Sequence, residues 1–121
     1  MTNPHQVPAD VAYAGAPSIV QEICLIAESS GEGPSDVSAD REFRLRKAAL
    51  LDRIALRERA RSDGEAADDA DDAALVAAEW LIEHDVAHRN LSRRGRDLVL
   101  AEDYREYVRS EYTVWASSQT A

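Results

Sequence analysis

The apolar positions of the chain recur at helical spacing in four segments that polar connections separate. Pro17 and Ser18 open the first segment, "IVQEICLIAES", which is apolar round most of its circumference. Such a pattern predicts a short helix buried against several neighbours. Ile and Val also favour a strand, but no other segment offers a partner strand. We therefore predict a helix, with Cys24 as a small buried side chain.

The second segment is predicted to be a long helix that is apolar on two sides. It follows a loop over 29–36, begins near Ser35 or Ser38, and ends near Arg61. Since a helix with two apolar sides needs two packing partners, we expect it to be the central helix of the domain, with a homodimer interface as the alternative. At 100° per residue the two sides are Phe43, Leu50 and Ile54 on one and Leu45, Ala49 and Leu56 on the other.

Two further helices follow an acidic stretch. Residues 62–72 contain six acids and no large apolar side chain, so we expect an exposed connection that places carboxylates at the start of a helix over about 72–89. Trp80 and Val76 lie on the flank of its apolar stripe and are predicted to close the core edge, or to mark an interface. The last helix, about 101–116, carries an aromatic face that should dock it on the bundle.

These elements predict an all-α fold, a small four-helix assembly whose long second helix is central. At 121 residues there is room for a single domain, here 17–116, with a flexible arm over 1–16 and a frayed end over 117–121. The first residues lack the basic start and apolar run of a secretory signal. No apolar stretch approaches the ~20 residues that cross a bilayer. The expected location is the cytoplasm, without membrane contact.

The charge of the chain alternates in blocks. Residues 1–40 sum to −6, 41–61 to +5, 62–88 to −9 and 89–109 to +2, within a net charge of −9. Positive segments can fold against negative ones, so self-complementary helices explain this pattern. A two-signed surface for a protein partner is the alternative.

Arginine-rich segments raise the question of nucleic acid. The long helix carries seven arginines, and "RNLSRRGR" adds four more, including Arg93, Arg94 and Arg96. The helix arginines are spread round its circumference, and a net charge of −9 opposes non-specific binding to nucleic acid. A nucleic-acid-binding regulator that uses Arg93, Arg94 and Arg96 is therefore the second hypothesis.

His84 and His88 form the most chemically suggestive motif. Their i,i+4 spacing could present two nitrogens to one metal ion, as in the HExxH motif of zinc peptidases. However, Asp85 replaces the motif's glutamate and its carboxylate stops about 1.5 Å short, where proton transfer needs contact near 3 Å. A catalytic zinc also needs a third protein ligand, and no sequence feature supplies one. We interpret the pair as a polar helix end at the surface, with a metal-binding protein as the third hypothesis.

The sequence predicts no enzymatic chemistry and no cofactor. Phosphate-binding loops, dinucleotide-binding glycines and nucleophile motifs are absent from it. We expect a non-enzymatic accessory or regulatory protein that acts through contacts with an unidentified protein partner. Its predicted interaction surface is the second side of the long helix, namely Leu45, Ala49 and Leu56 with Arg53 and Arg59 as a charged rim.

Overall fold

The computed structural model describes residues 8–30, 37–88 and 101–119, and it confirms the all-α fold. Every described element is a helix, and no strand occurs within these three ranges. The helices are α1 (Ala9–Ala12), α2 (Ile19–Ser30), α3 (Val37–Arg61), α4 (Glu65–His88) and α6 (Ala101–Gln119).

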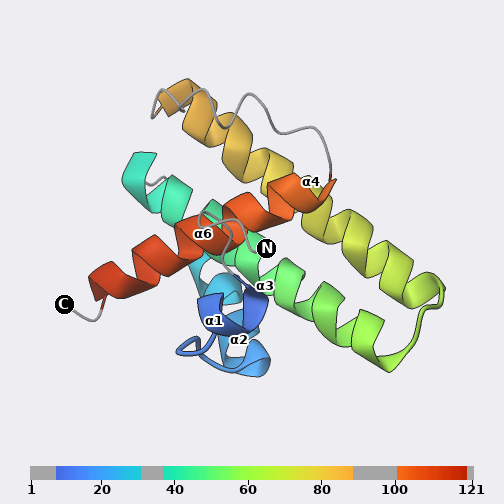
Figure 1. The fold of residues 1–121 in the computed structure, drawn as a ribbon. Coiled ribbons are helices and arrows are strands. Elements are labelled where there is room, and N and C mark those ends of the chain that lie inside the picture. The colour runs from blue at the N-terminus through green and yellow to red at the C-terminus, as the bar shows by residue number, and fades with distance from the viewer. Residues whose placement is uncertain (1–7, 31–36, 89–100, 120–121) are drawn as a thin grey trace.

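The two longest helices form the frame of the molecule. α3 and α4 run antiparallel as a hairpin, and α6 crosses one side of this pair (Figure 1). α2 packs on the flank of α3, and α1 contacts α6. The prediction of a central long helix is confirmed, because α3 contacts α4, α2 and α6. None of the described helices is both long and apolar enough to cross a membrane.

The core lies where α3, α4 and α6 meet. Alanines dominate the α3 and α4 sides of it, and small side chains let two helix backbones approach closely. Leu45 and Leu81 are its largest fully buried aliphatic residues, and burying each contributes about 1.5–3 kcal/mol. The buried cluster consists of Leu45, Ala48, Ala49, Ala77, Ala78, Leu81, Val108 and Tyr112.

α4 begins earlier than the sequence pattern predicts. The stretch 62–72, expected to be a connection, forms the first two turns of the helix from Glu65 onward. Ala67 is fully buried there, while Asp68 and Asp69 face solvent. Alanine is the strongest helix former, and carboxylates are favourable in a first turn. These two effects outweigh the loop-like polarity of the segment.

The two predicted ends also need correction. Residues 8–16, expected to be part of a flexible arm, include α1, bury Ala12 and stack the Tyr13 ring edge-on against Tyr112 at 5.3 Å. A single helical turn is too short to show a periodic pattern, so hydrophobic spacing does not predict it. At the other end α6 continues past Ala116 to Gln119. Residues 1–7 and 120–121 lie outside the described residues.

Candidate interaction surfaces

Three buried carboxylates hold the helices in place, and sequence reasoning missed all of them. Glu22 of α2, Asp52 of α3 and Asp85 of α4 are each almost fully buried. Each is bound by arginine from another helix, which keeps the charge paired inside the protein. A signal existed in the sequence, since Glu22 and Asp52 each stand among aliphatic residues that a helix would bury.

Asp52 joins α1, α3 and α6. Arg109 donates two hydrogen bonds to its carboxylate at 2.8 and 2.9 Å, and Arg105 donates one at 2.6 Å. The Tyr13 hydroxyl donates a further bond at 2.6 Å. Burial, followed by the charge and hydrogen bond of Asp52, raises the pKa of Tyr13 far above its usual value. Tyr13 therefore stays a donor at every physiological pH.

Asp85 joins α3, α4 and α6. Arg41 reaches it with two hydrogen bonds at 2.8 and 3.0 Å, and the same guanidinium donates to Glu111 at 2.7 Å. The Tyr107 hydroxyl also donates to the Asp85 carboxylate. Burial, together with this hydrogen bond, raises the pKa of Tyr107 well above its usual value.

The third carboxylate, Glu22, faces inward from α2 toward α3. Arg46 of α3 binds Glu22 through two hydrogen bonds at 2.9 and 3.1 Å. This inward acid turns the opposite side of α2 to solvent, and that side is apolar. The prediction that α2 is buried all round is wrong, because the charge pair occupies its inner side. Cys24, predicted to be buried, is exposed.

The solvent side of α2 forms a continuous apolar stripe. Its members follow the i, i+3, i+4, i+7 spacing that places side chains on one helical face. Val20 is 68% exposed and Ile23 46%, although Val and Ile are among the residue types most often fully buried. We call this surface the α2 stripe; it consists of Val20, Ile23, Cys24 and Ala27.

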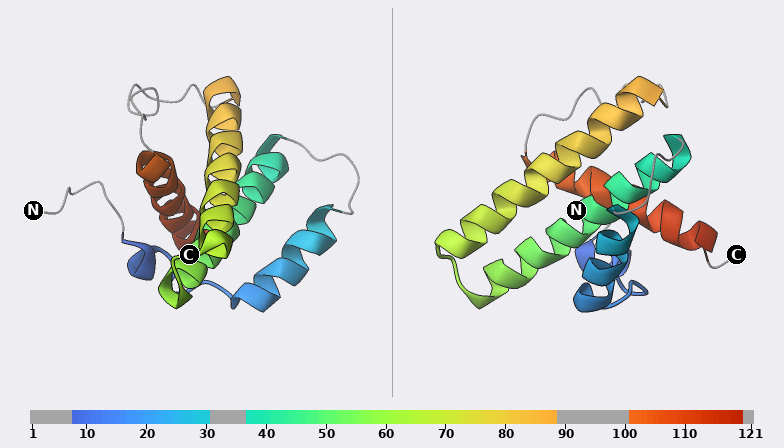
Figure 2. Two further views of the ribbon diagram at one scale, coloured as in Figure 1. Left: turned by 90° about the vertical axis from the view of Figure 1, so that its right-hand side faces the viewer. Right: turned by 180° about the vertical axis from the view of Figure 1, so that it is seen from behind.

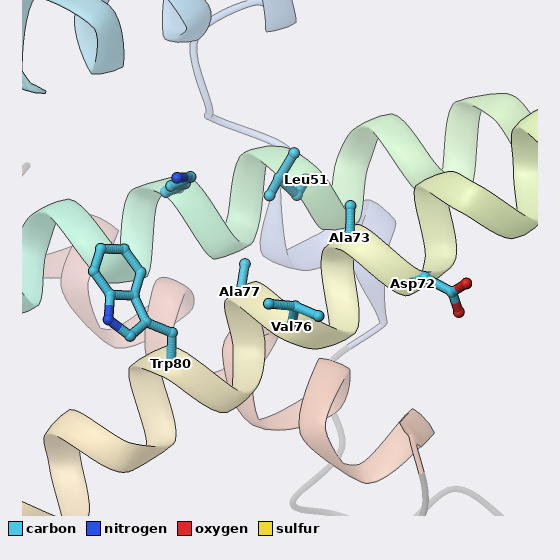
Figure 3. Close-up of a pocket in the computed structure, with 7 residues that line it drawn as sticks. Leu51, Asp72, Ala73, Val76, Ala77 and Trp80 are labelled. Carbon is cyan, nitrogen blue, oxygen red and sulfur yellow. The ribbon is translucent and has the colours of Figure 1, made fainter.

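A second apolar surface lies between α3 and α4, on the side of the pair away from α6 (Figure 3). It is a groove of about 520 Å³ with alanines along the α4 side. Val76 stands on its rim and is 64% exposed. We call this surface the Trp80 groove. It is lined by Lys47 and Leu51 of α3 and by Asp72, Ala73, Val76, Ala77 and Trp80 of α4.

Cations gather on the aromatic end of the Trp80 groove. The Arg44 guanidinium carbon lies 4.2 Å from the Trp80 ring centroid, and Lys47 Nζ lies 5.5 Å from it. Arg44 also donates to the Trp80 carbonyl at 2.9 Å, and Phe43 meets the indole edge-on. Trp80 is half-buried and borders this open groove, as expected for a residue at the core edge, and its role in an interface stays a prediction.

The surface predicted on the second side of α3 is mostly interior. Leu45 and Ala49 lie in the core beneath α4 and α6, so no partner can reach them, and Leu56 is half-buried. Of the two rim arginines, Arg53 lies over the Tyr13 ring at 5.8 Å. Arg59 pairs with three aspartates near the α3–α4 turn, Asp63, Asp68 and Asp71. The periodicity identified a genuine second side, but that side packs within the chain.

The histidine pair also differs from its interpretation as a surface helix end. His88 is exposed, but His84 is buried and its two ring nitrogens make no hydrogen bond. Its Nε2 is 3.5 Å from Asp40 Oδ2, and its ring lies 4.6 Å from that of His88. Across the described residues no three metal-ligating side chains come together, so a metal site with three protein ligands is not formed there.

Most arginines of the described helices bind acids of the same chain. Arg41, Arg46 and Arg59 on α3 all pair with acids on other helices or turns. On α6, Arg105 and Arg109 bind Asp52. This supports self-complementary charge as the explanation of the charge blocks. The segment predicted for nucleic acid (Arg93, Arg94 and Arg96) lies outside the described residues.

Comparison of the chain with models of protein families, with curated proteins and with solved structures gave no match. The α2 stripe and the Trp80 groove are therefore the features of the described helices from which a function can be inferred.

Proposed function

We propose that this protein is a non-enzymatic accessory protein of the cytoplasm that binds a protein partner through the α2 stripe. One observation carries the proposal: α2 buries the Glu22 carboxylate and exposes the apolar side chains of the α2 stripe. Burying Glu22 costs desolvation that only its pairing with Arg46 offsets, whereas exposing Val20 and Ile23 forgoes hydrophobic stabilisation. An apolar partner surface would recover about 1.5–3 kcal/mol for each large side chain that it covers.

The spacing of the stripe indicates the chemistry of that partner. Apolar anchors at i, i+3, i+4 and i+7 are the pattern by which an amphipathic helix enters a hydrophobic groove. α2 is 12 residues long, enough for four such anchors over two turns. The chain carries a net charge of −9, so a partner groove with a basic rim would be steered toward it. We therefore expect a protein with an apolar groove and basic edges.

The test is capture from a native lysate with the wild-type chain and two matched variants. Val20→Asp places a charge in the stripe. Val114→Asp makes the same change on α6, where Val114 is 67% exposed against 68% for Val20 and its neighbours one turn away are polar. We expect a protein that the wild type and Val114→Asp capture and that Val20→Asp loses by at least ~10-fold. Half of each lysate is treated with nuclease, which distinguishes a protein partner from the nucleic acid of the second hypothesis.

Cys24 supplies an independent readout because it is the single cysteine and lies within the stripe. The captured partner should slow maleimide labelling of Cys24. Equal capture by all three proteins, or labelling that the partner leaves unchanged, would contradict the α2 stripe as the binding surface. Capture that disappears with nuclease and with Arg93, Arg94 and Arg96 changed to Ala would instead establish the nucleic-acid hypothesis.

A further inference from the structure

α2 lies at the edge of the molecule, beyond α3, and buries little of its own surface (Figure 2, left). Among residues 19–28 only Glu22 is buried, Ile19 and Ile26 are half-buried, and the remaining side chains are exposed. None of these side chains belongs to the buried apolar cluster of α3, α4 and α6. α4, by contrast, places Leu81 and two alanines in that cluster. Hydrophobic burial therefore contributes much less to the docking of α2 than to that of α4.

The buried contact of α2 is an ion pair, and its net contribution to docking is small. Arg46 of α3 binds Glu22 with two hydrogen bonds, and the Arg46 guanidinium carbon lies 5.3 Å from the Trp115 ring centroid. The Coulomb attraction of such a pair is largely offset by the water that both charges lose on burial. When α2 leaves α3, Glu22 and Arg46 regain that water together. Leaving α3 is therefore far less costly than removing one partner of the pair by mutation.

The chain just before α2 is fixed more firmly than α2 itself. The Tyr13 hydroxyl donates to a buried carboxylate of α3 at 2.6 Å, and Ala16 packs against the buried cluster. Ser18 ends the short connection to α2 and exchanges two hydrogen bonds of 3.2 Å with Gln21. This pattern is a capping box, so α2 begins on contacts within its own sequence. α2 is thus a separate local unit that residues 13–16 attach to the core.

We propose that α2 is a detachable segment, which leaves α3 as one unit while α3, α4 and α6 stay folded. Local units that bury little apolar surface open at a lower free energy than the protein as a whole. An isolated helix of 12 residues is only marginally stable in water, so released α2 loses most of its helical hydrogen bonds. Residues 13–16 keep the released segment tethered to the core. The docked and released forms are in equilibrium in the chain alone.

Release completes the apolar face of α2. Ile19, Ile23 and Ile26 follow the i, i+4, i+7 spacing of one helical face, and Val20 lies beside them. In the docked form Ile19 and Ile26 are half-buried, so a partner reaches only part of this face. A partner groove that refolds the released segment covers all three isoleucines. This role of release rests on the function proposed for the α2 stripe, whereas release itself does not.

Hydrogen exchange of the chain alone, measured by NMR at several sub-denaturing urea concentrations, tests the proposal. After correction for intrinsic rates, the amides of residues 23–28 should exchange at least ~100-fold faster than the slowest amides of α4. They should also share one urea dependence, smaller than that of α4, because release exposes less surface than unfolding. Amides of residues 23–28 that exchange only through the global unfolding reported by α4, or that share no urea dependence, overturn the proposal.

Three variants show whether the ion pair controls release. Glu22→Gln and Arg46→Gln lie outside the α2 stripe and leave one partner of the docked pair uncompensated. Each should speed the exchange of residues 23–28 by at least ~10-fold and leave α4 unchanged. Arg59→Gln makes the same change on α3 at an arginine that binds aspartates near the α3–α4 turn, so it should leave α2 unchanged. Equal acceleration by Arg59→Gln, or none by the other two variants, contradicts the proposal.

Capture from a native lysate separates release from the function that it serves. Glu22→Gln raises the released fraction without altering the α2 stripe. It should therefore capture the partner that Val20→Asp loses several-fold more strongly than the wild type does. Weaker capture by Glu22→Gln would show that the partner binds docked α2 and would refute the role given to release. Release in the exchange experiment without any captured protein would contradict the function proposed for the α2 stripe and leave release established.

Discussion

Replacing Asp52 with asparagine tests whether the buried carboxylates hold the helices together. The substitution keeps the shape of the side chain but removes the charge that Arg105 and Arg109 bind at 2.6–2.9 Å. Breaking a buried ion pair by removing one partner costs about 3–5 kcal/mol. The two arginine side chains remain 15% and 17% exposed, so water compensates part of the loss. We therefore expect the free energy of unfolding to fall by about 3 kcal/mol.

Urea unfolding followed by circular dichroism at 222 nm measures this loss. Asp63→Asn is the matched control, because Asp63 pairs with Arg59 at 3.4 Å while its side chain is 86% exposed. Its effect should stay within about 0.5 kcal/mol. A domain of this size is stable by roughly 5–15 kcal/mol, so Asp52→Asn should still fold. A loss below about 1 kcal/mol, or one equal to that of Asp63→Asn, would refute the assignment of Asp52 as a structural junction.

Three further predictions concern the interior of the protein. Burial and the hydrogen bonds to buried aspartates raise the pKa of Tyr13 and Tyr107, so the folded state keeps both protons where unfolded tyrosine ionises. The contribution of these tyrosines to stability should therefore be constant below pH ~10 and fall above it by about 1.4 kcal/mol per pH unit per tyrosine. Burial also raises the pKa of Tyr112, so Tyr107→Phe should remove one tyrosine's share of that slope in urea titrations at pH ~10–11. Leu45→Asp should show no helical signal in circular dichroism, since Leu45 is fully buried. A folded Leu45→Asp would mean that Leu45 is accessible, as the predicted interaction surface requires. His84→Leu should raise the free energy of unfolding by about 1 kcal/mol, because both ring nitrogens are buried without hydrogen bonds, and a loss of stability would show that the imidazole is needed.

Helical periodicity predicts the fold class and the central position of α3, because both depend on apolar spacing alone. The two apolar sides of that helix correctly require two sets of neighbours. Periodicity does not reveal which side remains exposed, since Leu45 packs within the chain and Leu51 borders the open groove although both are leucines of one helix. That distinction depends on where α6 crosses the pair. Crossing position is a tertiary property that local spacing does not encode.

Charged residues in apolar segments are a signal that hydrophobic patterning undervalues. Patterning treats Glu22 as an interruption of α2, yet its pairing with Arg46 decides which side of α2 faces inward. Val20 and Cys24 lie on the opposite side of the helix from Glu22 and are exposed. Predicting it from sequence would have required the pairing between residues 24 positions apart, which spacing alone does not supply.

The alternating charge blocks acquire a structural explanation through these pairs. Arginines of α3 and α6 bind acids of α2, α3 and α4, so much of the positive charge is used inside the molecule. Arg41 or Arg109 could neutralise a phosphate only by leaving a buried carboxylate, at a cost of about 3–5 kcal/mol for each pair broken. The arginines that hold these buried carboxylates are therefore poorly placed to bind nucleic acid, and the hypothesis that Arg93, Arg94 and Arg96 bind it stays a prediction.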